Sequence, residues 1–485
     1  MKTLTKIGIL IFTMFSCQNK LDLIPISSKT DSGFYITSEH IEQALAGCYD
    51  ALQEAKVNQN FSYMLTEARS DNTWQTTFYD DGQFCRFSED ALNTTLATAW
   101  NNLYNYINRC NRVIYYVGEI DAQESSKNQW KGEALFIRSL LYFDLVRIFG
   151  EVPIVIEPLT IDDAYEVPKS TIQEVYDVIK NDLSEIVNNN WLSTEIFPGR
   201  ANIYAAKALL GKVLIYRSGY PLRTNEWSQA KLLFEDVIGS GEFEFFENYD
   251  DIFAFENENA GQSLFAIKFV DGTNEGNSFP SRNAPNEIDP SDFVFGGTPF
   301  RLHITEDIAK EIFPATNDFR KQSALRMSWL NKSGDTITND PWCRKYSEYK
   351  DQINGPVSGL NNWNIDFILI RFTDVMMLYA EALNELEGPN GEALAILNRV
   401  RARAGLEPNP QTDKETFRLW MEQERRSEFC FENERWFDLV RTDRALDVMQ
   451  AFLERQGGTF VNNFTDRSKY YYPIPQSVTD LTGIK

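Results

Sequence analysis

Apolar residues recur at every third and fourth position along five stretches in the first half of the chain, which is the spacing of amphipathic helices. The stretches are residues 96–117, 130–149, 175–187, 203–216 and 230–238. The turn sequence Gly219-Tyr220-Pro221 separates the last two, so the pattern predicts a helical hairpin there. Residues 377–386 and 392–404 repeat this plan on either side of Gly388-Pro389-Asn390-Gly391. Helix pairs joined by tight breaks predict a mainly α fold of tetratricopeptide-like hairpins.

The middle of the chain follows a different pattern. Residues 264–269 (LFAIKF) are typical of a short strand. Residues 271–364 are rich in Gly, Pro, Asn, Ser and Asp, which predicts long loops of the kind that carry binding sites on a rigid scaffold. We therefore expect a helical scaffold in residues 17–238. Residues 239–485 form a second region, in which the loops of 271–364 and helices of 371–446 pack on that scaffold.

The N-terminus has the features of an export signal. Lys2 and Lys6 precede a mostly apolar run at 7–15, whose nine residues are too few for the roughly 20 that span a bilayer. We therefore interpret residues 1–16 as a signal peptide. The sequence Phe15-Ser16-Cys17 resembles a lipobox, which makes Cys17 the predicted lipidation site. Because methionine stands at position 14, where leucine is usual, ordinary secretion with an unmodified Cys17 stays open.

The composition excludes several kinds of chemistry. Seventy acidic and 47 basic residues give a net charge of -23, which disfavours nucleic acid as a partner. Two histidines leave little material for zinc sites or a Ser/His/Asp triad. No cofactor is predicted. Asp335, Asp340 and Asp351 offer carboxylates for a structural calcium ion, but they lack the residue order of a calcium-binding loop. A structural calcium ion therefore stays an open alternative. Beyond Cys17, irregularly spaced cysteines at positions 48, 85, 110, 343 and 430 are expected to be buried thiols.

Several long motifs carry a family resemblance. They are WKGEALFIRS at 130–139, YFDLVRIFGEVP at 142–153, GRA at 199–201, RFTDVMMLYAE at 371–381, LNRVRARA at 397–404, ERRSEFCF at 424–431, RWFDLVR at 435–441 and YPIPQ at 472–476. In this order they resemble the SusD/RagB family of outer-membrane nutrient-binding lipoproteins. The resemblance implies a surface-exposed lipoprotein of the outer membrane, an oligosaccharide ligand, a SusC-like TonB-dependent transporter as partner, and no catalytic residues. The protein is therefore not expected to be an enzyme.

A glycan site requires flat aromatic rings for sugar faces and polar groups for hydroxyls. The segment at 69–74 offers Asp71 and Trp74, and family members often contact glycan from this segment and from the central loops. The central candidates are Trp329, Trp342 and Trp363, and the weaker ones are Phe78 and Tyr79. Arg371 is a further candidate, although a structural pair with Glu381 or Asp374 is favoured. The charged residues at 424–438 have helical spacing, which predicts a structural ion-pair network.

Two alternative functions remain from the sequence. Some relatives take up peptides or glycopeptides, and a peptide ligand would require a groove lined by helix faces. A glycoside hydrolase needs only two carboxylates, but no pair of acidic residues stands out. The identity of the glycan or peptide, and its charge, are not encoded in any motif that we recognise.

Overall fold

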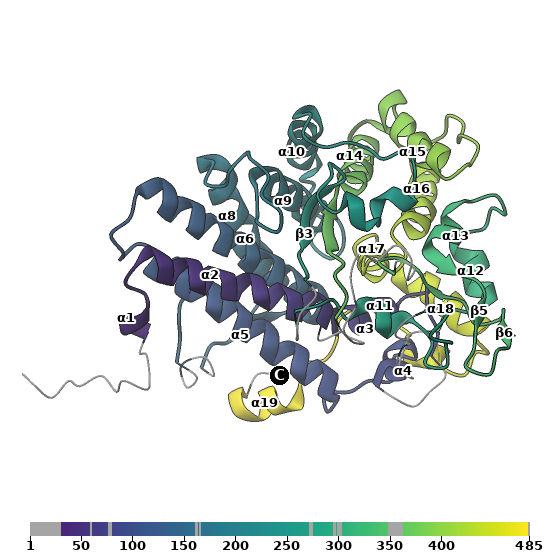
Figure 1. The fold of residues 1–485 in the computed structure, drawn as a ribbon, viewed down its shortest axis with the longest axis horizontal. Helices are drawn as coiled ribbons and strands as arrows, with labels where there is room; N and C mark the ends of the chain where they lie inside the picture. The colour runs from purple at the N-terminus through teal and green to yellow at the C-terminus, as the bar shows by residue number, and fades with distance from the viewer. Residues whose placement is uncertain are drawn as a thin grey trace, which may run out of the picture.

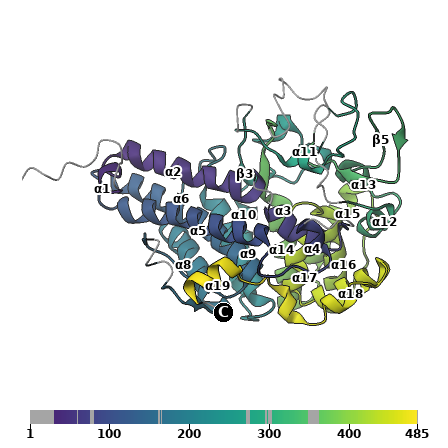
Figure 2. The same ribbon diagram turned by 90° about the horizontal axis from the view of Figure 1, so that it is seen from below.

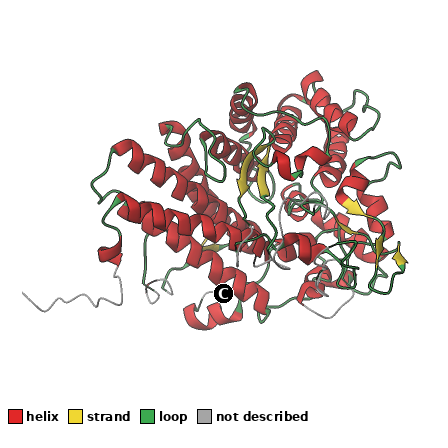
Figure 3. Cartoon of the chain, in the orientation of Figure 1, coloured by secondary structure: helices red, strands yellow, loops and turns green. Residues whose placement is uncertain are grey.

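The computed structural model describes residues 31–58, 61–75, 80–160, 163, 166–270, 275–293, 297, 303–347 and 362–483. Helices form most of it and strands are short, as Figures 1 and 3 show. The mainly α fold predicted from the sequence is confirmed. Cys17, Phe78 and Tyr79 lie outside the described residues.

Antiparallel helices build the N-terminal part. Neighbouring helices pack in sequence order, α5 on α6, α6 on α8, α8 on α9 and α9 on α10. Figure 1 shows this stack on the left of the molecule. The helices are α1 (Asp31–Phe34), α2 (Ser38–Gln53), α3 (Phe61–Thr66), α4 (Asp80–Cys85), α5 (Thr94–Tyr116), α6 (Glu124–Phe149), α8 (Ile172–Asn189), α9 (Ile203–Ser218) and α10 (Trp227–Gly239). All five helices predicted in this region are present.

Local sequence explains how these helices start and how closely they approach. Thr171 and Glu174 form a reciprocal capping box at the start of α8, and Asn202 caps α9. Helices α6 and α9 are buried around most of their circumference, as expected of central helices. A Cβ atom at Gly211 of α9 would lie 2.6 Å from the ring of Phe234 on α10. A small residue is therefore required where these two helices cross.

The hairpin of α14 (Phe372–Glu387) and α15 (Gly391–Arg403) continues the stack, because α10 packs on α14. The predicted break between them ends α14 at Gly388, whose φ of 80° lies in the region that favours glycine. The remaining C-terminal helices are α16 (Lys414–Glu428), α17 (Arg435–Arg441), α18 (Ala445–Arg455) and α19 (Gln476–Thr482). Among the described helices, none combines the length and the apolar character needed to cross a bilayer.

Short strands and helices form a layer over one side of the C-terminal helices, at the top right of Figure 2. Strand β3 (Ser263–Ile267) pairs antiparallel with β8 (Phe367–Arg371), which confirms the strand predicted near residue 264. Within the layer, β4 (Leu325–Arg326) pairs with β7 (Trp342–Cys343) and β5 (Trp329–Leu330) pairs with β6 (Thr336–Ile337). Helices α11 (Phe279–Asn283), α12 (Glu306–Ile312) and α13 (Arg320–Ala324) complete this layer. A separate pair, β1 (Val152–Pro153) with β2 (Lys169–Ser170), lies beside α6 in the N-terminal part. The proposed division at residue 238 stays a prediction.

Candidate functional site

The predicted aromatic platform is wrong, because all four nominated indoles are buried. Trp74 is 9% exposed and packs its ring edge-on against Phe452 at a centroid distance of 5.9 Å. Trp329 is 6% exposed, and its Nε1 donates to the Asp340 carbonyl at 2.8 Å. The two segments meet through His303, whose carbonyl accepts from the Trp74 backbone N–H and whose ring lies 3.5 Å from the Asp340 carboxylate.

Trp342 and Trp363 are the second pair, and they share one aromatic partner. The ring of Phe293 lies 5.1 Å from Trp342 and stacks on Trp363 at 4.9 Å. The two indoles are 1% and 0% exposed. Trp363 Nε1 donates to Ser281 Oγ at 2.7 Å, and its backbone pairs with Asn277. These side chains form the core of the loop layer and offer no ring face to a ligand.

Asp71 and Arg371 are buried in ion pairs, which corrects their assignment as ligand-binding residues. Asp71 accepts two hydrogen bonds from Arg435, at 2.8 and 3.0 Å, and lies 3.2 Å from Arg426. Burial alone would raise the pKa of this carboxyl, but the two guanidinium groups lower it well below its usual range. Arg371 pairs with Glu428 and Glu432, at 2.7 and 2.8 Å.

The structural pairing favoured for Arg371 is confirmed, but neither Glu381 nor Asp374 is its partner. Glu381 pairs with Arg441 at 2.5 Å, and Asp374 pairs with Arg425 at 2.7 Å and with Lys212 at 3.0 Å. Arg371 instead ends strand β8 beside the end of α16, where Glu428 lies. The predicted structural network of residues 424–438 is confirmed, although its contacts reach far beyond those helices.

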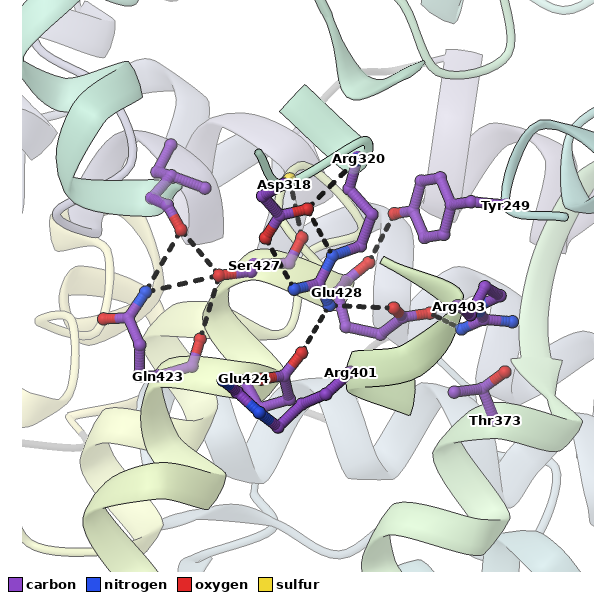
Figure 4. Close-up of polar contacts among 12 residues, drawn as sticks. Tyr249, Asp318, Arg320, Thr373, Arg401, Arg403, Gln423, Glu424, Ser427 and Glu428 are labelled. Atoms are coloured by element: carbon purple, nitrogen blue, oxygen red, sulfur yellow. Dashed lines mark hydrogen bonds and ion pairs between the residues drawn. The ribbon is translucent and has the colours of Figure 1, made fainter. Parts of the chain in front are cut away.

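The centre of this network is Glu428, a fully buried carboxylate at the end of α16. It pairs with Arg371, with Arg403 at 2.5 Å and with Arg320 at 3.2 Å. Figure 4 shows that Arg320 and Arg403 approach Glu428 from different elements, and that Tyr249 donates to the Glu428 carbonyl. Burial raises the pKa of this carboxyl, but the surrounding guanidinium groups outweigh that effect and lower it. The network therefore attaches the loop layer to the helical scaffold.

Glu424, one turn earlier on α16, extends the network. It pairs with Arg320 at 2.7 Å and with Arg401 at 3.0 Å, and Arg320 also pairs with Asp318 at 2.8 Å (Figure 4). Ser427 donates to the Ile312 carbonyl at 2.6 Å, which connects α16 to α12. Helix α16 is thus the element on which α12, α13, α15 and β8 converge.

A groove of about 710 Å³ lies on another side of the same helices. The turn at 218–227 forms one wall and the exposed residues of α16 form another, while buried residues of α14, α16 and α17 form the floor. Six carboxylates and five guanidinium groups line it, together with Tyr220, Trp227 and Leu419. Its volume lies within the range of about 300–1,000 Å³ typical of small-molecule sites. No motif in the sequence indicated this groove, since its residues come from four separate segments.

The charged side chains of the groove are paired with one another. Arg418 forms two hydrogen bonds with Glu385, at 2.6 and 2.5 Å, and Arg444 pairs with Glu422 at 3.0 Å. At the floor, Arg425 and Arg441 both contact Asp438 at 2.8 Å. Arginine partners lower the pKa of Glu385 and Asp438 despite the opposing effect of burial. The groove therefore presents fixed, ionised groups.

In the described part of the chain, no group of three or more His, Cys, Asp or Glu side chains has the geometry of a metal site. Asp351, one of the three aspartates considered for calcium, lies outside the described residues. The five cysteines at positions 48, 85, 110, 343 and 430 are free and buried, as predicted.

The fold defines a helical-repeat protein, with a tetratricopeptide-like scaffold that carries a loop layer and a polar surface groove. Two family models match the chain in separate ranges. The model described as "SusD family" matches residues 316–483, and the one described as "Starch-binding associating with outer membrane" matches residues 21–215. The chain belongs to the SusD/RagB family.

Individual relatives agree with this assignment. The SusD-like protein P38 of Formosa agariphila is 27% identical over 90% of each chain. A SusD homologue from Bacteroides thetaiotaomicron has a solved structure with a TM-score of 0.79 at 21% identity, covering 93% of this chain and 96% of its own. A laminarin-binding SusD-like protein gives a TM-score of 0.76 at 23% identity, covering 93% and 99%. At these identities the solved structures establish the fold.

Proposed function

We propose that this protein is a non-catalytic, cell-surface glycan-binding protein that captures oligosaccharide or polysaccharide and delivers it to a SusC-like TonB-dependent transporter in the outer membrane. The observation that carries this proposal is membership of the SusD/RagB family, with matches to family models in both halves of the chain. The description of one model as starch-binding and outer-membrane-associated supports it. The laminarin-binding relative supports the same class of ligand.

The chemistry of the groove favours binding over hydrolysis. Glycoside hydrolysis requires one carboxylic acid that holds its proton, which means a raised pKa. In the groove, Glu385 and Asp438 have lowered pKa values because arginines face them. Such carboxylates accept hydrogen bonds from ligand hydroxyls but are poor general acids at neutral pH.

A glycan array with the mature protein tests the proposal directly. We expect retention on one class of polysaccharide and no release of reducing ends from it. A peptide ligand would require a groove lined by helix faces, and this groove is partly lined by them. A peptide array is therefore the second experiment. Binding to peptides with no binding to any glycan would replace our proposal with the peptide alternative. Reducing-end release would show instead that the protein is a hydrolase.

The proposed location has its own test. Cys17→Ala should release the protein from the outer-membrane fraction, and the wild-type protein should be digested by protease added to intact cells. Purification from membranes should recover a TonB-dependent β-barrel together with this chain. An unchanged membrane fraction for Cys17→Ala would contradict the lipid anchor without affecting glycan binding.

A further inference from the structure

The groove between the turn at 218–227 and α16 lies away from the central loops. Figure 2 shows α9, α17 and α18 on one side of the molecule and α11 and β5 on the other. We propose that this groove is a carbohydrate site that binds a segment of a neutral oligosaccharide. The inference rests on the proposed function, and it assigns the ligand to a surface that the sequence motifs did not indicate.

The groove offers apolar surface to sugar C–H faces. Trp227 and Tyr220 are half-buried on the wall formed by the turn, and Leu419 is 53% exposed on the α16 wall. The Tyr220 ring packs edge-on against Tyr470 at 5.3 Å, so its orientation is fixed before a ligand arrives. Rings held in this way bind flat apolar faces without a large loss of side-chain entropy.

The polar lining suits hydroxyl groups better than a charged ligand. Its guanidinium and carboxylate groups are nearly equal in number and already paired, as Arg223 is with Asp443 at 2.9 Å. Paired groups keep hydrogen-bonding capacity for hydroxyls, which both donate and accept. An acidic sugar would add negative charge beside six carboxylates, on a chain of net charge -23. The lining therefore favours a neutral glycan.

The wall of the groove is held in an unusual backbone conformation. Arg223, Asn225 and Asp443 all have positive φ values, between 53° and 59°. Such conformations cost about 1–3 kcal/mol each and persist where the surrounding structure imposes them, often at binding sites. One of the contacts that hold the turn is the Tyr220 N–H donating to the Arg441 carbonyl at 2.8 Å.

The floor contains two polar atoms that lack partners. Arg425 Nη2 and Asn384 Oδ1 are buried, and neither has a hydrogen-bond partner among the described residues. Both side chains line the groove. One atom is a donor and the other an acceptor, so each would gain from a hydrogen-bond partner such as an ordered water.

Calorimetric titration with laminarin oligosaccharides tests the assignment. Trp227→Ala should weaken binding by about 3- to 10-fold, the loss expected for one aromatic contact. Leu419→Arg should weaken it by at least about 10-fold, because a long charged side chain would fill the groove from an exposed position. Matched controls are Trp191→Ala, a half-buried indole outside the groove, and Leu232→Arg, 64% exposed on α10. Both controls should bind like wild type.

Hydrogen exchange with the same oligosaccharides gives an independent readout, with protection expected in residues 218–227 and 415–425. Wild-type affinity in both groove variants, or protection confined to other segments, would overturn the groove assignment while leaving glycan binding intact. If Trp227→Ala fails to fold, Leu419→Arg decides. If wild type binds no glycan of any kind on the array, the assignment and the proposed function both fail, whereas binding of acidic glycans alone overturns the groove assignment and leaves the proposed function intact. Oligogalacturonate binding as tight as laminarin would overturn the neutral class.

Discussion

Replacing Glu428 with glutamine tests whether the buried ion-pair network holds the loop layer in place. Glutamine keeps the size of the side chain and removes its charge. Arg320 would retain Asp318 and Glu424, and Arg371 would retain Glu432. Among the described residues, Arg403 has Glu428 as its one carboxylate partner, and its side chain is fully buried. The variant therefore leaves a buried guanidinium without a counter-charge.

The size of the effect follows from this burial. Removing one partner of a buried ion pair costs about 3–5 kcal/mol. Unfolding entropy of about 2.1 cal/mol/K per residue gives roughly 1 kcal/mol/K for a chain of this length, so Tm should fall by about 3–5 °C if the protein unfolds as one unit. Scanning calorimetry measures this shift. The control is Glu415→Gln, which removes an exposed partner of Arg418 and should change Tm by less than about 1 °C.

A double-mutant cycle that combines Glu428→Gln with Arg403→Met measures the interaction energy between Arg403 and Glu428. The double variant should be less destabilised than the sum of the two single variants by at least about 1 kcal/mol, because neither buried charge then remains alone. The lowered pKa of Glu428 gives a second signature. The ionised Glu428 carboxylate contributes to the free energy of unfolding in full above its unfolded-state pKa near 4.5. This contribution is lost as the pH falls toward the pKa of the folded state. Additive effects, or a Tm shift equal to that of the exposed control, would refute the reasoning.

Three further predictions concern titration, the turn and the thiols. Burial raises the pKa of Glu67 to about 7, so the folded state loses up to about 3 kcal/mol as pH rises from about 4.5 to about 7. Between about pH 5 and about pH 8, the loss of unfolding free energy measured with denaturant should be larger in wild type than in Glu67→Gln by up to about 3 kcal/mol, and equal losses in both would contradict it. Gly219→Ala places a Cβ 2.3 Å from the Arg441 carbonyl oxygen and should cost about 1–3 kcal/mol by thermal unfolding. Its control, Gly239→Ala, has nothing within 4 Å and should be neutral or stabilising, so equal losses would contradict the steric argument. In Cys17→Ser protein the five buried thiols should react with Ellman's reagent only after denaturation, and rapid native labelling would contradict their burial.

Helices could be predicted from the sequence because their information is local. The apolar spacing of residues 96–117 specifies α5 almost completely. The pattern at 130–149 misses the first turns of α6, which starts at Glu124, because ESSKNQ at 124–129 is polar and has no apolar periodicity. The sequence does contain a start signal for α8, because Thr171 is followed by Glu174 at the spacing of a capping box. Errors therefore concentrate at helix ends.

The candidate site could not be predicted in the same way, because burial depends on residues that are distant in sequence. The polar neighbours of Trp363 suggest an exposed loop, yet its ring is covered by Phe293 from a separate segment. Trp74 is covered by Phe452 of α18 in the same manner. Aromatic residues in polar segments of a large protein can thus form the core of the loop layer itself.

Several of the longest connections in the chain are made by buried charged side chains, and these connections hold a loop layer with few regular strands in one position. Asp71 reaches Arg435 across 364 residues, and Arg69 reaches the Lys469 carbonyl across 400. Buried pairs contribute little net stability compared with apolar contacts, but a misplaced partner leaves a buried charge unpaired at high cost. Helix α16 contributes charged side chains to both regions, because Glu424 and Glu428 face the loop layer while Arg425 forms part of the groove floor. The same helix therefore fixes both surfaces, as a preorganised binding protein requires.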